Sequence, residues 1–326
     1  MLTQRCGCNF TDIEHKHFYN DVIKGLRASP KRLHSKYFYD ERGDELFQQI
    51  MNSPEYYPTD CEMEIFTRQT HELAKIAQQD GSPFDLIELG AGDATKSFHL
   101  LKYLVNQETD FTYLPIDISS HVITYLEETL PLSIPGLNLN GLNGEYFEML
   151  KKASALSNRR KVILLLGGNI GNMPVADAQD FCIEMRRHLS PGDIVVMGVD
   201  LKKNPKVIRA AYEDAGGVTK QFNLNLLLRI NRELNADFNV DQFDHYCNYE
   251  PETGACKSYL ISLINQQVCI NGETFIFKRD DYIWMEISQK YTVDEINQIA
   301  IRAGYRPMQH LTDSKQWFID GVFMAE

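Results

Sequence analysis

The stretch Phe84-Asp-Leu-Ile-Glu-Leu-Gly-Ala-Gly-Asp-Ala-Thr-Lys96 is the part of this sequence from which a fold is most readily predicted. Mostly apolar residues lead into an acidic residue, and a Gly-x-Gly turn follows before a segment typical of a helix. This order predicts a buried strand, a tight glycine turn and the start of a helix. An α/β domain opens a pocket for a nucleotide-like ligand in this way.

A second acidic residue, Asp117, ends the next strand-like run, Phe111-Thr-Tyr-Leu-Pro-Ile-Asp117. An acid at this place can accept hydrogen bonds from both hydroxyls of a ribose. The two runs together therefore predict a ribose-bearing cofactor. The first run alone is also compatible with a plain strand, turn and helix that bind nothing.

The residues of the turn favour S-adenosyl-L-methionine (SAM) over a dinucleotide. Thr95 replaces the third glycine of the dinucleotide pattern Gly-x-Gly-x-x-Gly, and that glycine lets the helix pack close beside a pyrophosphate. SAM carries no phosphate and has a positive sulfonium. The carboxylates of Glu88, Asp93 and Asp117 complement this positive charge better than they complement a pyrophosphate.

The composition excludes several classes of protein. The chain has 326 residues, of which 43% are hydrophobic and 24% charged, which is typical of a globular protein. No run approaches the ~18–20 apolar residues that span a bilayer, and the first residues lack the apolar core of a signal peptide. The seven cysteines include no Cys-x-x-Cys pair, so we expect no metal site, and we expect Cys6 and Cys8 to lie in a disordered terminus.

The net charge of −12 narrows the choice of partner. Because binding to phosphates requires basic clusters, we expect no nucleic acid as partner. We also expect no membrane partner, and a small-molecule substrate instead. The scattered cysteines indicate a reducing compartment, so we expect a cytoplasmic protein, which we take to be a monomer.

Short apolar runs alternate with helix-like segments from Phe84 to Asp200. The expected strands are Asp85–Leu89, Phe111–Asp117, Gly136–Leu142, Lys161–Leu166 and Asp193–Val199. The helices expected between them include Ser120–Thr129, Glu145–Ala155 and Ala176–His188. This alternation predicts an α/β, doubly wound Rossmann-like domain, in which helices cover both faces of a parallel sheet.

The alternation breaks near residue 203. Residues 205–235 are typical of two helices, and residues 255–288 alternate like antiparallel strands with a turn at Asn271-Gly272. A helix returns at Thr292–Gly304, and Trp317–Met324 is typical of a closing strand. We therefore expect a disordered segment 1–12, a SAM-binding methyltransferase domain of residues 62–202 plus 288–326, and a second, smaller α+β substrate-binding lobe of residues 13–61 plus 203–287.

Three further motifs could bind a ligand or could only pack. In Gly167-Gly-Asn-Ile-Gly-Asn172 the glycines permit close approach of a ligand, and the Asn172 amide can bind a carboxylate or an amine. A turn with positive φ would use the same residues. Tyr56 lies in an aromatic turn that could line a pocket or form a packed corner. Glu286 and Ser288 share one strand face, where they could hold an imidazole or face solvent.

The chain resembles the histidine-specific methyltransferases, which convert L-histidine to histidine betaine (hercynine), the first step towards ergothioneine. The resemblance spans about Leu26 to Ala325. The pieces that carry it are Lys36–Asp40 with Gly43, Pro54–Thr59, Glu88–Lys96, Leu114–Ser119, Gly167–Asn172, Ala211–Ala215 with Gly217–Thr219, Phe222-Asn223 with Asn231–Leu234 and Ala236–Phe238, and Glu286–Lys290.

The resemblance implies roles for individual residues. At the positions where the family holds its cofactor, SAM, this chain has Tyr39, Gly90, Lys96, Asp117, Glu145 and Tyr146. Asp117 would bind the ribose, and Glu145 stands where the family usually has Asp near the adenine. At the positions where the family holds L-histidine, this chain has Tyr56, Asn172, Tyr212, Glu286 and Ser288.

The implied reaction is methylation of the α-amino group of L-histidine, three times in succession. Asn172 and Tyr212 would clamp the substrate carboxylate, and the other three residues would face the imidazole. Catalysis would then come mostly from positioning, with no metal and no single catalytic residue.

Two further positions depart from the family. Asn169 stands where the family usually has Thr, and Ser258 lies near a position that is often Met. The same chemistry on another amino acid therefore stays open, as do a nicotinamide dehydrogenase and a non-catalytic sensor of the cofactor or an amino acid.

Overall fold

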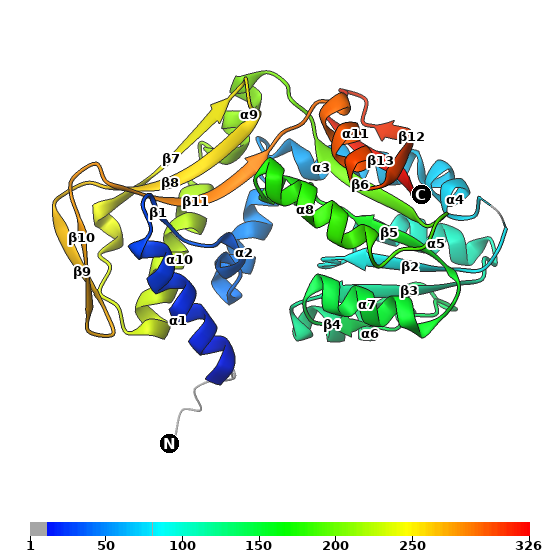
Figure 1. Ribbon diagram of the computed structural model, residues 1–326, viewed down its shortest axis with the longest axis horizontal. Helices are drawn as coiled ribbons and strands as arrows, with labels where there is room; N and C mark the ends of the chain where they lie inside the picture. The colour runs from blue at the N-terminus through cyan, green and yellow to red at the C-terminus, as the bar shows by residue number, and fades with distance from the viewer. Residues whose placement is uncertain (1–11, 80) are drawn as a thin grey trace. The chain divides into compact units, whose positions relative to one another are not determined.

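The computed structural model describes residues 12–79 and 81–326 (Figure 1). The chain divides into two compact units. Unit 1 contains the described residues up to Tyr56 together with Pro205–Glu250 and Ala255–Ile287, and unit 2 contains Tyr57–Asn204, Pro251–Gly254 and Ser288–Glu326. Residues 1–11 lie outside the described residues. This range includes Cys6, Cys8 and all but the last residue of the segment 1–12 that we expected to be disordered.

The units differ from the expected domains mainly at helix α3 (Tyr57–Arg68). We expected a boundary after residue 61, but α3 belongs as a whole to unit 2. The reason is that its buried side chains, among them Ile65 and Phe66, lie on the face that packs in unit 2. The later insertion begins at Pro205, the first residue of helix α9, rather than at residue 203.

The centre of unit 2 is a sheet with the strand order β12-β13-β6-β5-β2-β3-β4. Its strands are β2 (Phe84–Leu89), β3 (Phe111–Asp117), β4 (Leu142–Asn143), β5 (Arg160–Leu165), β6 (Ile194–Asp200), β12 (Tyr305–Thr312) and β13 (Phe318–Ala325). The strands from β6 to β4 run parallel, whereas β13 is antiparallel to both β6 and β12. The chain passes from β2 to β3 on one side and later adds β5 on the other. The switch point therefore lies at the carboxyl ends of β2 and β5.

Four of the expected strands are confirmed to within one residue, as β2, β3, β5 and β6. The expectation for Gly136–Leu142 is wrong over most of its length, because β4 contains only its last residue. Pro135 has no N–H to donate, and Gly136 has a φ of 93°, so the backbone turns there. Leu139 makes only an isolated bridge to β3.

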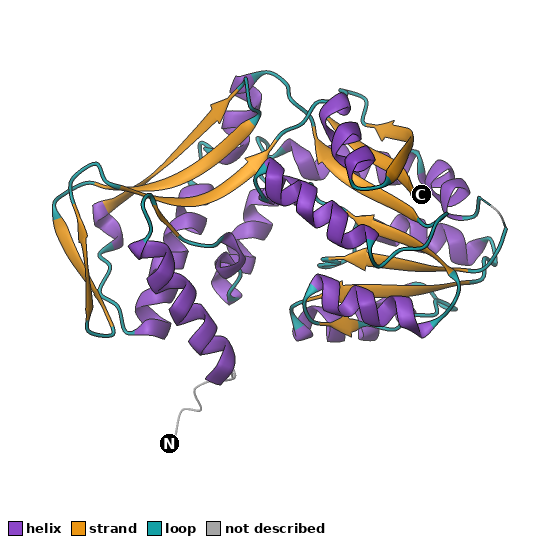
Figure 2. Ribbon diagram, in the orientation of Figure 1, coloured by secondary structure: helices purple, strands orange, loops and turns teal. Residues whose placement is uncertain are grey.

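Helices cover both faces of this sheet (Figure 2). Besides α3 they are α4 (Thr70–Ala77), α5 (Ser97–Asn106), α6 (Ser120–Ser133), α7 (Tyr146–Leu156), α8 (Val175–Arg186) and α11 (Val293–Arg302), with a 3-10 turn η2 (Asn169–Asn172). The expected helices are confirmed as α6, α7, α8 and α11. Helix α11 starts with a capping box, in which Thr292 and Glu295 each accept a backbone N–H of the other.

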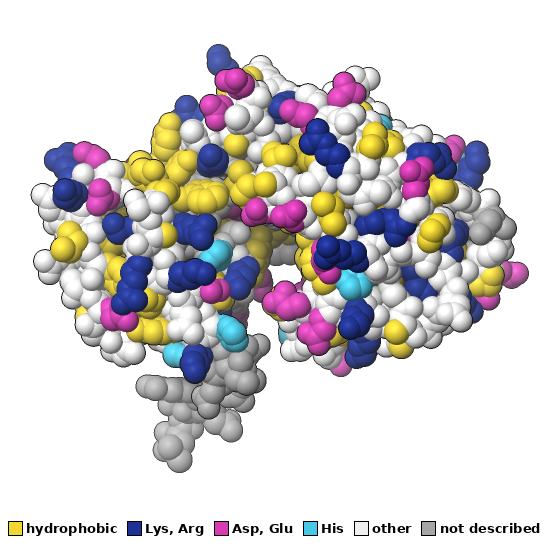
Figure 3. Space-filling view, viewed as in Figure 1, with side chains coloured by type: hydrophobic (Ala, Val, Ile, Leu, Met, Phe, Trp, Pro, Cys, Tyr) yellow, Lys and Arg dark blue, Asp and Glu magenta, His cyan; other side chains and the backbone are white. Residues whose placement is uncertain are grey.

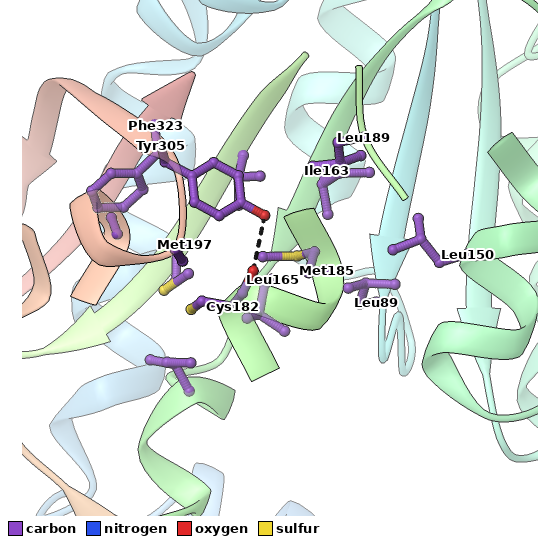
Figure 4. Close-up of a cluster of buried hydrophobic side chains, with 14 of the residues drawn as sticks. Leu89, Leu150, Ile163, Leu165, Cys182, Met185, Leu189, Met197, Tyr305 and Phe323 are labelled. Atoms are coloured by element: carbon purple, nitrogen blue, oxygen red, sulfur yellow. Dashed lines mark hydrogen bonds between the residues drawn. The ribbon is translucent and has the colours of Figure 1, made fainter. Parts of the chain in front are cut away.

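The core of unit 2 lies between one face of the sheet and its helices (Figure 4). Ile163 and Leu165 of β5 and Met197 of β6 are almost entirely buried there. The hydroxyl of Tyr305 enters this core and donates to the Cys182 carbonyl at 3.3 Å. The buried strands thus form a rigid base from which the loops at their carboxyl ends extend.

Unit 1 is built around a smaller sheet with the order β1-β11-β8-β7. Its elements are α1 (Asp12–Arg27), β1 (Lys31–Arg32), η1 (Ser35–Phe38), α2 (Glu41–Met51), α9 (Pro205–Tyr212), α10 (Val218–Leu234), η3 (Val240–Gln242), β7 (Phe243–Glu250), β8 (Ala255–Ser262), β9 (Gln266–Ile270), β10 (Glu273–Phe277) and β11 (Tyr282–Gln289), whose last two residues belong to unit 2. The expected turn joins β9 to β10, where Asn271 and Gly272 have φ of 48° and 87°. This turn was predictable from the sequence because both of its central residues need positive φ, which Asn and Gly adopt most readily.

The sheet of unit 1 buries one face and exposes aromatic side chains on the other. Ile283 and Met285 of β11 pack into a core with α1 and α10. On the opposite face Tyr259 lies 6.4 Å from Tyr246 and 5.4 Å from Tyr282, measured between ring centroids. Figure 3 shows hydrophobic side chains gathered over these strands. Among the described residues, no helix has the length and apolar character to cross a bilayer.

Candidate active site

The glycine turn after β2 has no room for a side chain at its first glycine. Gly90 has a φ of 72°, and a Cβ atom there would lie 2.5 Å from the hydroxyl of Tyr146 and 3.4 Å from Nδ2 of Asn169. Gly92 continues the turn with a φ of 52°. Segments that follow β2, β4 and β5 therefore converge on Gly90 at the carboxyl edge of the sheet, where α/β domains bind ligands.

Asp117 ends β3 beside the same turn. Its Oδ2 accepts a hydrogen bond from the backbone N–H of Gly92 at 3.2 Å, and its Oδ1 accepts one from Ser119 at 2.9 Å. These two bonds hold a partly exposed carboxylate at the end of the strand. An acid in this position is suited to accept hydrogen bonds from ribose hydroxyls.

Glu145 and Tyr146 stand at the start of α7, close to Asp117. The backbone N–H of Gly144 donates to the Asp117 carbonyl at 3.0 Å, which joins the two segments. Burial raises the pKa of Tyr146 to about 12, and the charges of Asp117 and Glu145 add to this effect. The Tyr146 hydroxyl is therefore protonated at neutral pH. The structure thus brings together Gly90, Asp117, Glu145 and Tyr146, four of the residues to which the family resemblance gives a cofactor role.

Lys96 lies just before α5 and forms an ion pair with Glu62 of α3. The Lys96 side chain is 20% exposed, whereas that of Glu62 is fully buried. Burial lowers the pKa of Lys96, but the attraction of nearby carboxylates, Glu62 first among them, outweighs burial and raises it. The Lys96 side chain is therefore a charged donor beside the glycine turn.

The glycine-rich segment after β5 forms two left-handed residues and then the turn η2. Gly167 and Gly168 have φ of 74° and 68°. Asn172, at the end of η2, is exposed, and its Nδ2 donates to Asn169 Oδ1 at 3.4 Å. A Cβ atom at Gly171 would lie 2.7 Å from the Gln289 carbonyl, so η2 packs closely against the end of β11. Asn172 therefore lies at the carboxyl edge of the unit 2 sheet, as expected.

Ser288 belongs to a buried polar network that the sequence did not reveal. The Lys290 ammonium donates to Ser288 Oγ at 2.8 Å and pairs with Asp200 Oδ2 at 2.6 Å. Asp200 also accepts a hydrogen bond from Tyr57 at 2.8 Å and pairs with Lys203. Burial raises the pKa of Asp200, but the two lysines outweigh burial and lower it, so this carboxylate is charged. The one hint in the sequence was the spacing of Lys290, two residues beyond Ser288.

Tyr39, Tyr56 and Tyr212, all in unit 1, are linked by aromatic contacts. Tyr56 meets Tyr212 edge to face at 6.0 Å between ring centroids. Phe47 of α2 lies 6.4 Å from Tyr56 and 5.5 Å from Tyr39. Tyr39, which is 43% exposed, also contacts Phe222 of α10 at 5.7 Å. The three tyrosines therefore belong to one chain of aromatic contacts within unit 1.

Glu286 and Ser288 lie on the same face of β11, as their spacing predicted. Met285 and Ile287, which alternate with them, are buried on the opposite face. Glu286 is partly buried, and its carbonyl accepts a hydrogen bond from the Trp284 indole at 3.0 Å. Ser258 is buried in β8 directly opposite Cys247 of β7.

Comparison with known proteins identifies the family. The family described as "Histidine-specific methyltransferase, SAM-dependent" matches residues 18–325. The chain belongs to this family. It is therefore a SAM-dependent amino-acid N-methyltransferase, and the hypotheses of a nicotinamide dehydrogenase and of a non-catalytic sensor are set aside.

Named relatives cover most of the chain. The histidine N-alpha-methyltransferase of Mycobacterium tuberculosis is 32% identical over 93% of this chain and 93% of its own length. The enzyme of the same name from Mycolicibacterium smegmatis is 32% identical over 90% of each. The ergothioneine biosynthesis protein 1 of Neurospora crassa is 29% identical over 89% of this chain and 33% of its own length. Among solved structures, mitomycin 7-O-methyltransferase aligns with a TM-score of 0.47, 11% identity, and coverage of 89% of this chain and 59% of its own.

Several groups at the carboxyl edge of the unit 2 sheet have the chemistry that SAM, the cofactor of this methyltransferase, requires. The Asp117 carboxylate, the Tyr146 hydroxyl and the cradle at Gly90 are suited to a nucleoside that carries a positive sulfonium. Within residues 12–79 and 81–326, no three His, Cys, Asp or Glu side chains gather in a way that could hold a metal ion.

Glu88, which we expected to complement the cofactor's charge, is instead buried inside β2. It is 3% exposed and accepts a hydrogen bond from the Tyr113 hydroxyl at 2.6 Å. Burial raises the pKa of Glu88 to about 7, and the hydrogen bonds from Tyr113 and Ser97 and the charge of Lys96 only partly offset burial. Glu88 therefore contributes less negative charge near the turn than we expected.

The raised pKa of Glu88 predicts a pH dependence of stability. Between pH 4.5, the ordinary value, and about pH 7 the folded state keeps a proton that the unfolded state releases. The free energy of unfolding therefore falls as the pH rises through this window, by about 3 kcal/mol in all, and levels off above it. In Glu88→Gln this loss is absent. Denaturant unfolding at several pH values should show the variant gaining stability over the natural protein as the pH rises, and a constant difference would contradict the prediction.

Proposed function

We propose that this methyltransferase transfers three methyl groups from SAM to the α-amino nitrogen of L-histidine, giving histidine betaine (hercynine). The relatives named histidine N-alpha-methyltransferase support histidine as the substrate. The observation on which the proposal depends most is the pairing of Glu286 and Ser288 on one face of β11. A carboxylate and a hydroxyl two residues apart match the two nitrogens of an imidazole.

The imidazole would be held as a neutral ring. Glu286 would accept a hydrogen bond from one ring N–H, and Ser288 would donate to the other nitrogen. Ser288 Oγ already accepts from the Lys290 ammonium at 2.8 Å, so its own proton points away from Lys290. The positive charge of Lys290 behind Ser288 also disfavours an imidazolium. Tyr56 would complete this end of the substrate site.

The amino-acid end of the substrate would be held by Asn172 and Tyr212. The exposed amide of Asn172 and the phenol of Tyr212 can both donate to a carboxylate. Holding the carboxylate and the ring leaves the α-amino group as the part of the substrate that faces the cofactor. Such positioning can contribute ~7–11 kcal/mol to lowering a barrier.

The cofactor would be held by Tyr39, Gly90, Lys96, Asp117, Glu145 and Tyr146, with Asp117 on the ribose hydroxyls. When bound, SAM would supply a methyl group carried on a positively charged sulfur. A neutral amine can accept this methyl group, and S-adenosylhomocysteine is then the leaving group. The substrate amine must lose its proton before each transfer. Since no described residue is placed as an obvious base, we propose that ordered water takes this proton to solvent.

The number of methyl groups can be tested from the order in which products form. Purified protein is incubated with L-histidine and excess SAM, and products are followed over time by mass spectrometry. The proposal predicts transient mono- and dimethylhistidine and a trimethylated end product. A reaction that stops at one or two methyl groups with SAM still in excess would contradict trimethylation and leave histidine methylation intact.

Another amino acid is the second candidate substrate. The 4-dimethylallyltryptophan N-methyltransferase of Claviceps fusiformis is 30% identical over 64% of this chain and 62% of its own length. Asn169, which stands where the family usually has Thr, and Ser258, near a position that is often Met, would be the first residues to examine in that case. Methylation of a different amino acid would point to them.

A further inference from the structure

Glu62 of α3 is a fully buried carboxylate that bonds two segments of the proposed cofactor site. Its two oxygens accept the backbone N–H of Gly167, each at 2.9 Å, and it forms the ion pair with Lys96. Gly167 begins the glycine-rich segment after β5, and Lys96 follows the turn after β2. One side chain from a helix remote in sequence therefore connects the two loops at the switch point of the sheet.

The sheet leaves space for Glu62 at Gly198. A Cβ atom at this position of β6 would overlap Oε1 of Glu62. Gly198 therefore lets the carboxylate lie directly on the sheet, in the interior of unit 2. The buried position of the Glu62 carboxylate therefore depends on a glycine at residue 198 of β6.

A second buried carboxyl group, Asp320, stands beside Glu62. Asp320 of β13 pairs in register with Gly198 and is fully buried. No donor in the described part of the chain reaches either of its oxygens. Burial and then the charge of Glu62 raise the pKa of Asp320 well above its ordinary value, and Lys96 opposes this only in part. Two adjacent carboxylates in a nonpolar interior cannot both ionise at low cost.

We propose that Glu62 and Asp320 share one proton, and that this pair is the positioning device that holds Lys96 and Gly167 in the arrangement that binds SAM. In this state Asp320 is neutral and donates its proton to Glu62, and the single negative charge of the pair balances Lys96. The buried cluster is then neutral overall, and the otherwise unpartnered Asp320 gains a hydrogen-bond partner. The inference rests on the proposed role of Lys96 in cofactor binding.

Calorimetric titration with S-adenosylhomocysteine tests the positioning role. Glu62→Gln keeps an acceptor for Gly167 but removes the charge opposite Lys96, so affinity should fall about tenfold. Asp320→Asn is neutral and can still donate to Glu62, so its affinity should stay within about twofold of the natural protein. The matched control is Asp60→Asn, an exposed carboxylate of the same helix, which should bind normally.

Infrared spectroscopy tests the shared proton directly. The natural protein should show the C=O stretching band of a protonated carboxylic acid that is missing from Asp320→Asn. Absence of that band would overturn the inference. So would normal affinity of Glu62→Gln for S-adenosylhomocysteine, or an affinity of Asp320→Asn as low as that of Glu62→Gln. If Glu62→Gln does not fold, the infrared band and the Asp320→Asn titration still test it. Normal binding by Lys96→Ala would instead contradict the role proposed for Lys96.

Discussion

Asp117→Ala is expected to lose most of its affinity for S-adenosylhomocysteine. The variant removes the carboxylate that is proposed to accept hydrogen bonds from two ribose hydroxyls, and each bond to a charged acceptor contributes ~1.5–3 kcal/mol. It also removes the two bonds that Asp117 accepts from Gly92 and Ser119, which hold the glycine turn beside β3. We therefore expect affinity to fall by about a hundredfold or more in calorimetry.

Two controls separate ribose binding from damage to the turn. Asp117→Asn keeps an oxygen that can accept from Gly92, so it should fold normally and bind with intermediate affinity. Asp110→Asn changes an exposed carboxylate just before β3, at the opposite end of that strand, and should bind normally. An Asp117→Ala variant with the affinity of the natural protein would remove Asp117 from the cofactor site.

Glu286→Ala is expected to lose histidine binding while cofactor binding is retained. The variant leaves a ring N–H of the substrate without its acceptor, at a cost of about 1–3 kcal/mol in the binding free energy. Histidine affinity, measured by calorimetry with S-adenosylhomocysteine present, should fall by about 5- to 150-fold. Unchanged histidine affinity would contradict the assignment of Glu286 to the imidazole.

Two measurements make the Glu286 experiment specific. The affinity for S-adenosylhomocysteine alone should stay unchanged, which shows that the fold and cofactor site are intact. Glu286→Gln keeps a neutral acceptor and should bind histidine better than Glu286→Ala. Equal losses in the two variants would indicate that the charge, rather than the hydrogen bond, carries the interaction.

The sheet of unit 2 was predictable because its central strands consist mostly of apolar residues. β2, β5 and β6 are buried on both faces, and such runs are distinctive in a sequence. The edge strand β12 was missed because most of its residues are exposed or half-buried and Pro307 interrupts it. β7 was missed for a related reason, since polar residues such as Asp244 and Asn248 alternate with its buried ones.

The candidate site was predictable only where its chemistry lies in short motifs. Asp117 and Gly90 follow directly from the strand and turn patterns. By contrast, Glu62 reaches Gly167 and Lys290 reaches Asp200 across long stretches of sequence. Neither pair has a spacing that a sequence pattern could reveal. Buried ion pairs of this kind depend on the register of the sheet and on which helix face packs against it, which only the folded chain displays.

The most direct test of histidine methylation is a screen of all the amino acids for methyl transfer. Purified protein is incubated with SAM and each of the twenty standard amino acids in turn, and products are identified by mass spectrometry. We expect methyl groups to be added to L-histidine alone, up to a total of three. Methylation of a different amino acid, with none on histidine, would contradict the proposed substrate and would direct attention to Asn169 and Ser258.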